Sequence, residues 1–451
     1  MPRFETHSHS WFSNIRLLDS INNPKDLILT AAELGYKGIT LTDHEALCGA
    51  VQWLKLEKEL KKEEKIPTDF CCALGNEIYL TETRDSKQKY YHYILIAKDT
   101  EGFHQLCKLS SKAWYNSYFD RGLERVPTLM TELEEIVMGN PGHLIADTAC
   151  LGSITADLAL QLDKAEHSQN KEQVLVLRKK LEHWFEWNKK LFGDDFYLEI
   201  APSASPDQIV YNKKLKQFAE IFNIKIVCGS DAHYLVAEDR FVHKAYLNSK
   251  EGEREVDDFY QYAHLMDDEE AFENVKMNFS RDEFDIICEN SLEIMEKIQS
   301  YEIFHNPIIP RVEVKEYPLL APRDERLKTH ELLNDLFTST NEQERYWINQ
   351  CWEALIKYNI ADEKHIARVE TEADILRAVG KKLGNCLFEY FNTFQHFINT
   401  FWECGSIVGP GRGSAVCFLS NFLLGITQLD PVQWGLAEWR FLNKERTELP
   451  K

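Results

Sequence analysis

The sequence predicts an α/β fold over its first 250 residues and a mainly helical region after them. In the first part, short apolar runs alternate with amphipathic stretches of helical period, and many of the apolar runs end at a turn. Strands are predicted at 4–10, 38–42, 71–74, 91–97, 143–146, 196–200 and 224–228. So many strand–helix units predict a parallel sheet closed into a barrel, with functional side chains at the carboxyl ends of the strands.

Helix signals lie between these strands. Asn23 is a typical N-cap residue and Pro24 suits the first helical position, so a helix is predicted over 25–34, ending at Gly35. Further helices are predicted from Glu101, near Met130, and over 48–65 and 171–191.

The pattern changes near residue 250, where a charged run at 251–255 precedes the helical region. Asn306-Pro307 and Ile309-Pro310 indicate an extended linker near 303–322. Helices are predicted at 284–298, 328–358, 370–383 and 385–404, and the phenylalanines of the last one read as core. We therefore expect three parts: 1–250, 251–322 and 323–451.

Composition restricts the possible functions. The net charge of −21 argues against a general basic coating for nucleic acid, so any DNA contact must come from a local patch. The 11 cysteines include no Cys-x-x-Cys pair, so we expect neither a disulfide framework nor a zinc ribbon, and their odd number in a chain this long indicates a reducing compartment. No signal-peptide pattern and no run near ~18 apolar residues is present, so we expect a cytoplasmic protein with no membrane partner.

Three polar dyads follow apolar runs. His7-x-His9 and Asp231-x-His233 share a spacing that, on an extended backbone, aims both side chains at one face. The third dyad, Asp43-His44, ends a predicted strand; there we expect His44 to be a ligand and Asp43 to orient it. Together the dyads predict a shared metal site.

Three further residues are candidates for the same site. Glu77 follows an apolar strand, where a carboxylate is costly without a partner. His92 and Cys150 also lie beside apolar residues, so for these two the alternative of core packing stays open. Imidazole and carboxylate ligands suit Zn²⁺, Mn²⁺ or Fe²⁺, and Cys150 favours zinc in one position.

The order of these motifs, with Gly75-Asn76-Glu77-Ile78-Tyr79 and Asp231-x-His233-Tyr234 among them, resembles the polymerase-and-histidinol-phosphatase (PHP) domain. The resemblance implies a distorted (β/α) barrel holding two or three divalent metal ions for phosphoester hydrolysis. It implies catalytic roles for His7, His9, His44, Glu77, Asp231 and His233. The implied metal ligands are His7, His9, Asp19, His44, Glu77, His92, Cys150, Asp231 and His233, with a longer spacing before Asp19 than the family shows.

A second motif lies near the end of the chain, at Gly409-Pro410-Gly411-Arg412-Gly413-Ser414. Alternating glycines let backbone N–H groups converge on an anion, Arg412 supplies a fork for phosphate oxygens, and a helix is predicted over 416–424. The run matches neither the Walker A pattern nor the dinucleotide fingerprint, and a plain structural turn is the alternative.

With Leu424-Gly425-Ile426-Thr427 and the stretch at 440–446, this loop resembles the start of the palm in C-family bacterial replicative DNA polymerases, the DNA polymerase III alpha subunits. The resemblance implies that Gly411, Arg412, Gly413 and Ser414 bind the triphosphate of an incoming dNTP on a DNA primer-template. In that family an Asp-x-Asp pair for Mg²⁺ follows next, and it is not in this sequence. We therefore expect an N-terminal piece that polymerises only with a second polypeptide.

Three functions remain open from the sequence. The chain is the N-terminal part of a C-family polymerase, with a PHP site that hydrolyses phosphoesters as a 3′–5′ exonuclease. Alternatively, it is a stand-alone metal-dependent phosphoesterase. In the third possibility, the PHP domain is a non-catalytic module that stabilises the fold or docks a partner.

Overall fold

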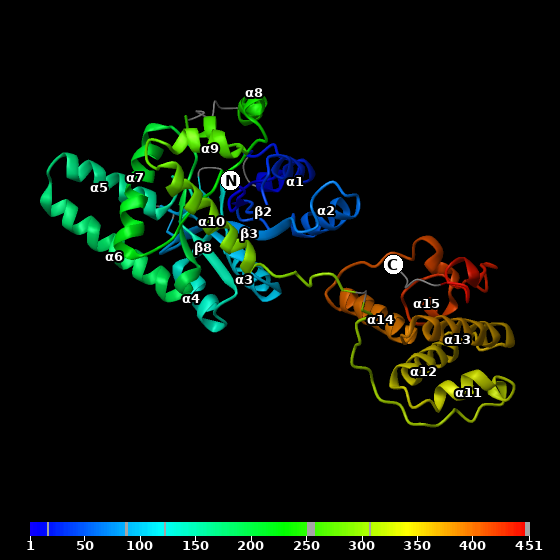
Figure 1. Ribbon diagram of the computed structural model, residues 1–451. Coiled ribbons are helices and arrows are strands. Elements are labelled where there is room, and N and C mark those ends of the chain that lie inside the picture. Colours follow the sequence, from blue (N-terminus) through cyan, green and yellow to red (C-terminus); the bar gives the residue numbers. More distant parts are fainter. Residues whose placement is uncertain (16–17, 86–88, 121–122, 250–257, 306–307, 447–451) are drawn as a thin grey trace. The chain divides into compact units, whose positions relative to one another are not determined.

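A computed structural model describes residues 1–15, 18–85, 89–120, 123–249, 258–305 and 308–446 (Figure 1). The chain divides into two compact units, Met1–Ile303 and Phe304–Lys451. The signals expected at 251–255 and at Asn306-Pro307 lie outside the described residues. The division at residues 250 and 322 therefore stays a prediction.

The first unit is built around one eight-stranded sheet with the order β1-β2-β3-β4-β8-β9-β10, and β7 pairs with β3. A small hairpin, β5 with β6, stands apart from it. The strands are β1 Phe4–Glu5, β2 Gly38–Leu41, β3 Cys71–Thr81, β4 Tyr91–Ala97, β5 Tyr118–Asp120, β6 Leu123–Arg125, β7 Pro127–Leu129, β8 Leu144–Asp147, β9 Phe196–Ile200 and β10 Ile226–Cys228.

The sheet closes at one rim through the segments that follow β1 and β10. There the backbone N–H of His9 donates to the carbonyl of Ala232 at 3.0 Å, and Ser8 and Ala232 form a parallel bridge. Of the strand predicted over 4–10, only Phe4–Glu5 is a regular strand. The residues that follow it join the two ends of the sheet. The result is a nearly closed, barrel-like fold of the predicted class.

One strand of this sheet, β4, is antiparallel to its neighbours. β4 pairs antiparallel with both β3 and β8, whereas the β1–β2, β2–β3, β8–β9 and β9–β10 pairs are parallel. The expectation of an all-parallel sheet is wrong at this strand. The reversal places the first residues of β4, His92 among them, at the rim where the parallel strands end.

β3 is also longer than predicted, running to Thr81 rather than to Leu74. Its first half pairs with β2, and its second half, Gly75 to Leu80, pairs with β4. Glu77 therefore lies inside a strand and not just past its end, which corrects the position expected for it. This extension carries the carboxylate into the rim.

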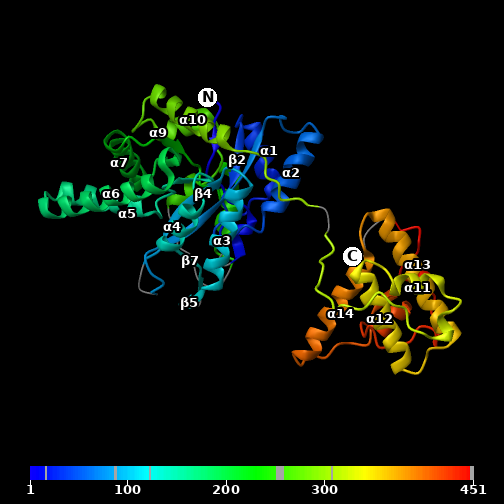
Figure 2. The ribbon, with the colours of Figure 1, turned by 90° about the horizontal axis from the view of Figure 1, so that it is seen from below.

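Helices cover the outside of the sheet (Figures 1 and 2). α5 and α6 lie side by side, and α10 packs on β1 and β10, where Ser291 Oγ accepts from the Phe4 N–H at 3.0 Å. The first-unit helices are α1 Pro24–Glu33, α2 Ala50–Lys62, α3 Thr100–Tyr115, α4 Met130–Gly139, α5 Ile154–His167, α6 Lys171–Phe192, α7 Pro206–Phe222, α8 Arg240–Leu247, α9 Asp268–Val275 and α10 Arg281–Lys297.

Local signals explain several helix ends. The Asn23 side chain caps α1 at Lys25 with Pro24 in first position, as predicted, and Ser280 and Glu283 form a capping box at the start of α10. The prediction missed α5, α7, α8 and α9. Inside the sheet, Phe4, Ile94, Tyr197 and Val227 pack with Ile294 of α10 into a buried core.

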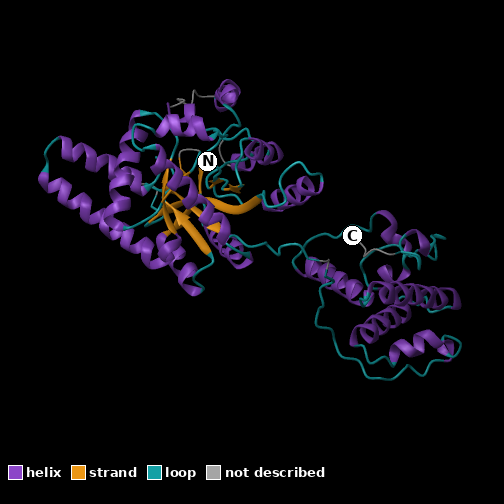
Figure 3. Ribbon diagram, in the orientation of Figure 1, coloured by secondary structure: helices purple, strands orange, loops and turns teal. Residues whose placement is uncertain are grey.

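The second unit has helices and no strand among its described residues (Figure 3). The helix predicted over 328–358 is two helices, because Asn341 caps a new helix start through Gln343. The helices are α11 Glu331–Phe337, α12 Glu342–Lys357, α13 Glu363–Leu383, α14 Leu387–Glu403 and α15 Leu419–Leu423, with 3-10 turns at Glu325–Leu327, Gly413–Cys417 and Glu438–Arg440.

Candidate metal centre

The predicted dyads meet at the rim of the barrel. Nε2 of His7 lies 3.0 Å from Nε2 of His9, and Oδ1 of Asp231 lies 3.2 and 3.1 Å from the same two nitrogens. Oε2 of Glu77 lies 3.3 Å from His9 Nε2 and 2.5 Å from His44 Nδ1. All of these side chains are buried.

Three overlapping groups of side chains place their ligand atoms within 4.8 Å of one another. Such spacing lets one ion or several neighbouring ions be bound by residues that are far apart in sequence. The groups are His9 with His44 and His233, His7 with His9 and Glu77, and His44 with Glu77 and His92.

Three histidines have one ring nitrogen held by the protein. His7 Nδ1 lies 2.7 Å from Oε1 of Glu199, and His9 Nδ1 lies 3.1 Å from Oγ of Ser13. His233 Nδ1 lies 2.8 Å from the carbonyl of Asp231. An N–H that donates to these oxygens leaves Nε2 of each ring as the free ligand atom facing the cluster.

Asp43 acts on a different histidine from the one expected. Its carboxylate accepts from the Ser10 N–H at 2.7 Å and from Ser13 Oγ at 2.7 Å, and no hydrogen bond or ion pair joins it to the His44 ring among those found in the described residues. Ser13 Oγ in turn lies within hydrogen-bond distance of His9 Nδ1. Asp43 therefore orients His9 through Ser13, which corrects the expectation that it orients His44.

Charge inside the cluster sets the proton state of its histidines. Burial, together with His44 and His233, lowers the pKa of His9 to about 3, so this ring is neutral and can bind a metal. Burial alone would also lower the pKa of His7, but the Asp231 and Glu199 carboxylates raise it well above its ordinary value. Burial opposes ionisation of Glu77, yet His92 and His44 hold its pKa well below normal.

Asp19, the least regular of the predicted ligands, lies in the same site. Its Oδ2 is 2.8 Å from His44 Nε2 and 3.5 Å from His233 Nε2. Tyr260 donates to its Oδ1 at 2.8 Å, and His243 Nε2 lies 2.7 Å from its backbone carbonyl. These two supports fix the position of Asp19.

His92 and Cys150 lie at the edge of the cluster. His92 Nδ1 contacts Oε1 of Glu77 and lies 3.5 Å from Sγ of Cys150. Burial, with the Asp231 and Glu77 carboxylates, raises the pKa of the Cys150 thiol well above normal, so it is protonated here. Cys150 is in none of the three ligand groups found in the described residues.

The backbone is strained around the rim. Glu45, Ala149 and Asp231 have φ values of 48°, 54° and 46°, in the left-handed region that non-glycine residues seldom adopt. Each is next to a predicted ligand or is one itself. Strain of about 1–3 kcal/mol per residue persists where the surrounding structure fixes a functional geometry.

The residues present fit divalent metal ions. Both ring nitrogens of His44, both carboxylate oxygens of Glu77 and Oδ1 of Asp231 are buried, and none of these atoms makes a well-aligned hydrogen bond to the described residues. Their nearest polar neighbours are other members of the cluster. Carboxylates and imidazoles gathered this closely without aligned hydrogen bonds are costly to bury, and a bound cation would offset that cost.

Glu199 and Ser13 are functional residues that the sequence reasoning did not single out. Glu199 is a buried carboxylate inside the apolar strand β9, and that pattern was a usable signal because an unpaired charge there is costly. Ser13 gave no such signal, since its role depends on Asp43 being folded against it.

The Gly-rich loop of the second unit is exposed at Gly411, Arg412, Gly413 and Ser414. The helix predicted over 416–424 is instead a 3-10 turn, Gly413–Cys417, followed by the five-residue α15. Phe418 interrupts it in an extended conformation, so no long helix dipole points at the loop. Gly411 has φ +130°, and a Cβ there would lie 2.5 Å from Cγ1 of Val416.

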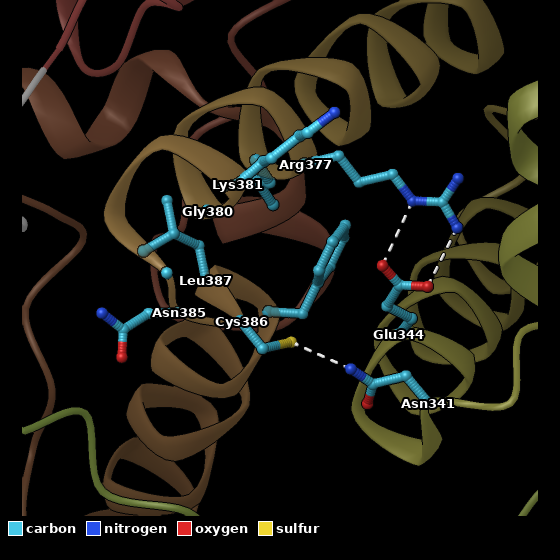
Figure 4. A pocket seen from close by; sticks show the side chains of 11 residues that line it. Asn341, Glu344, Arg377, Gly380, Lys381, Asn385, Cys386 and Leu387 are labelled. Carbon is cyan, nitrogen blue, oxygen red and sulfur yellow. Dashed lines mark hydrogen bonds and ion pairs between the residues drawn. The ribbon is translucent and has the colours of Figure 1, made fainter.

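A cavity of about 320 Å³ lies elsewhere in the second unit, among α12, α13 and α14 (Figure 4). Arg377 pairs with Glu344 through two contacts of 3.1 and 2.9 Å, and Asn341 Nδ2 donates to Cys386 Sγ at 3.4 Å. The Gly411–Ser414 loop does not line this cavity. This cavity therefore gives no support to the nucleotide site predicted at the loop.

The barrel-like sheet and its rim of histidines and carboxylates define a PHP domain, and the sequence matches that family over residues 5–203. Residues 338–451 match the bacterial DNA polymerase III alpha NTPase domain. The chain therefore belongs to the DNA polymerase III alpha family and corresponds to its N-terminal part.

Relatives match nearly the whole chain. A DNA-directed DNA polymerase of Bacillus phage SPbeta is 37% identical over 464 residues, covering 98% of this chain and 36% of the relative. The DNA polymerase III subunit alpha of Aquifex aeolicus is 32% identical, with 98% and 35% covered, and that of Thermus aquaticus is 28% identical, with 98% and 37% covered.

The chain thus spans about a third of the length of these relatives. Among solved structures, an amidohydrolase from Chromobacterium violaceum shares 14% identity with a TM-score of 0.30, over 51% of this chain and 87% of that one; this score is too low to support an inference. In the described residues, no helix has the length and apolar character needed to cross a bilayer.

Proposed function

We propose that the first unit is a metal-dependent phosphoesterase that acts on DNA, as a 3′–5′ exonuclease, within a polymerase of the DNA polymerase III alpha family. The cluster of His7, His9, Glu77 and Asp231, with ligand atoms a few ångströms apart and buried, supports the proposal. Divalent ions bound there would lower the pKa of water and neutralise phosphate charge.

The side chains have separable roles in this proposal. His7, His9 and His233 present Nε2 to the cluster because Glu199, Ser13 and a backbone carbonyl occupy their other nitrogens. Glu77 and Asp231 bridge between histidines, and Asp19 extends the site towards His44 and His233. His92 and Cys150 stay proposed ligands at its edge. We propose zinc, manganese or iron as the metal, in two or three positions.

The test follows the shortening of 5′-labelled single-stranded DNA by the 451-residue chain with Mn²⁺ or Zn²⁺. We expect a ladder of labelled strands shortened from the 3′ end, and a fall in the hydrolysis rate of more than about a hundredfold in His9→Ala, since a ligand is removed from the cluster. His104→Ala, an exposed histidine on α3, is the matched control. Metal binding without any hydrolysis would favour the non-catalytic docking role instead.

DNA synthesis is a separate proposal. The polymerase activity that the relatives' names state would require Mg²⁺ ligands from a second polypeptide, with Gly411, Arg412, Gly413 and Ser414 contacting the dNTP triphosphate. We expect no primer extension by the chain alone with Mg²⁺, and extension once the remaining part of a related polymerase is added. Extension by the chain alone would overturn this proposal.

A further inference from the structure

A cavity of about 420 Å³ lies on the first unit between the β3–β4 hairpin and the helices α5 and α6. None of the metal-centre residues lines it. Its walls include Tyr91, Trp184 and Trp187, and Lys89, Lys180 and His183 also line it. Its size falls in the range of ligand-binding pockets.

The aromatic wall is an ordered stack. Trp184 and Trp187 lie about one turn apart on α6, with ring centroids 5.4 Å apart and an angle of 19° between their planes. Trp184 is buried, while Trp187 and Tyr91 keep part of their surface accessible. A planar ring entering the cavity therefore meets aromatic side chains that are already aligned.

The polar ends of these rings are all bound by the protein. Trp184 Nε1 donates to Thr155 Oγ1 at 2.9 Å, and Tyr91 OH donates to Asp157 Oδ2 at 2.9 Å. Trp187 hydrogen-bonds the carboxylate of Glu134. The rings are thus held in place, and what they offer a ligand is stacking on their faces.

Cations stand beside this wall in a strongly acidic chain. Lys89 Nζ lies 4.8 Å from the centre of the Tyr91 ring and 3.3 Å from Asp157 Oδ1. Lys180 lies exposed on α6 and forms no ion pair among those found in the described residues. Glu82 is an acidic lining residue, so the positive charge is local and modest.

The cavity shares two chain segments with the metal centre. On β4, Tyr91 lines the cavity while the next residue, His92, contacts Glu77 in the cluster. Gly152 accepts from the His92 N–H at 3.1 Å, and Ile154, two residues on, lines the cavity. Because consecutive residues of a strand point to opposite faces, the cavity and the cluster lie on opposite sides of the first residues of β4, and a nucleic-acid strand that reaches both passes over that end of the strand.

We propose that the cavity is a stacking subsite for one base of a single-stranded nucleic acid. Aromatic faces bind bases with little sequence preference, and neighbouring lysines attract the phosphate backbone. As a subsite for a substrate strand, the inference rests on the proposed nuclease function. As a site of nucleic-acid binding, it is measurable without any hydrolysis.

The test measures fluorescence anisotropy of a labelled oligodeoxyadenylate of about eight nucleotides, a usual site size, with the full chain in EDTA. A second oligomer of equal length lacks the bases. We expect the intact oligomer to bind more tightly than the abasic one, and Trp187→Ala to weaken its binding by about fivefold or more. Trp187→Phe keeps a ring and should bind nearly as well as the unaltered chain.

Two controls match these changes on the same helix. Leu175→Ala removes an exposed apolar side chain outside the cavity and should leave binding unchanged. Lys180→Gln should lower the salt dependence of binding by about 0.7 in slope, whereas Lys179→Gln should not, because only Lys180 lines the cavity. Equal binding of the abasic oligomer, or of Trp187→Ala, would overturn the proposal. Loss of hydrolysis with unchanged binding would count only against the nuclease function.

Discussion

Nδ1 of His7 lies 2.7 Å from Oε1 of Glu199, and both side chains are buried. This contact decides which nitrogen of His7 faces the cluster, because the proton on Nδ1 is held by the carboxylate. Nε2 then faces Asp231, whose Oδ1 lies 3.2 Å away. A residue of β9 thus sets the chemistry of a residue that follows β1.

Replacing Glu199 with glutamine should lower the affinity for divalent metal by about 10–100-fold, the usual effect of removing a carboxylate behind a ligating histidine. The amide is nearly the same size but no longer carries the charge that favours the Nδ1–H form of His7. Titration with Mn²⁺ followed by calorimetry measures the effect. Glu172→Gln, an exposed change on α6, is the control, and an unchanged affinity in Glu199→Gln would show that the contact is structural only.

Removing metal should destabilise the first unit and not the second. An ion present at 100 times its dissociation constant stabilises the folded state that binds it by about 2.7 kcal/mol. Thermal unfolding of the chain with Mn²⁺ and with EDTA, monitored by hydrogen exchange in each unit, measures this change in stability. Mn²⁺ is preferred to Zn²⁺ because the unfolded chain's cysteines and histidines would also bind zinc.

The control for that experiment is His9→Ala. This variant has its own stability, but adding Mn²⁺ should raise it by much less than it raises the unaltered chain. A shift of equal size in both proteins, or a shift confined to the second unit, would place the metal elsewhere.

The sequence predicted the convergence of the histidines and carboxylates better than it predicted the strands that carry them. His7 and His9 converge because alternation on an extended backbone depends only on local geometry. The direction of β4 and the length of β3 depend on which strands pair, and nothing local to 91–97 encodes an antiparallel neighbour. His92 therefore reaches the rim from the start of its strand.

The partners that orient the ligands were harder to find for the same reason. Asp43 was expected to act on its neighbour His44, but the fold places Ser13 between Asp43 and His9. In the second unit, the helix predicted over 416–424 breaks at Phe418, whose ring is fully buried. Tertiary packing overrides local propensity at such positions.

Gly411→Ala should destabilise the second unit by about 1–3 kcal/mol, since alanine is strained at φ +130° and its Cβ would meet Val416. Gly409→Ala has open space and no positive φ, so it should be nearly neutral. Urea unfolding of the full chain, with hydrogen exchange in the second unit as readout, compares the two. If both variants were equally stable, Gly411 would not be required by the fold, and the loop's glycines would be better explained by a ligand.

Glu372 gives the second unit a predictable pH dependence. Burial raises the pKa of Glu372 to about 6. The backbone N–H groups of Ser420 and Leu419, which donate to its carboxylate at 2.8 and 2.6 Å, favour the charged form and offset part of this rise. The ordinary value is 4.5, so between pH 4.5 and 6 the folded state binds more protons than the unfolded state. The free energy of unfolding therefore falls as pH rises through this window, by about 2 kcal/mol in total.

Glu372→Gln removes the titrating group. The unfolding free energy of the unaltered chain minus that of this variant should therefore fall by about 2 kcal/mol between pH 4.5 and 7. Urea unfolding at several pH values, with hydrogen exchange in α13 as readout, isolates the second unit from the metal centre. Glu403→Gln, at the exposed end of α14, should follow the unaltered chain at every pH. A constant difference for Glu372→Gln would mean that the carboxyl titrates alike in the folded and unfolded chain, and that its two backbone hydrogen bonds fully offset its burial.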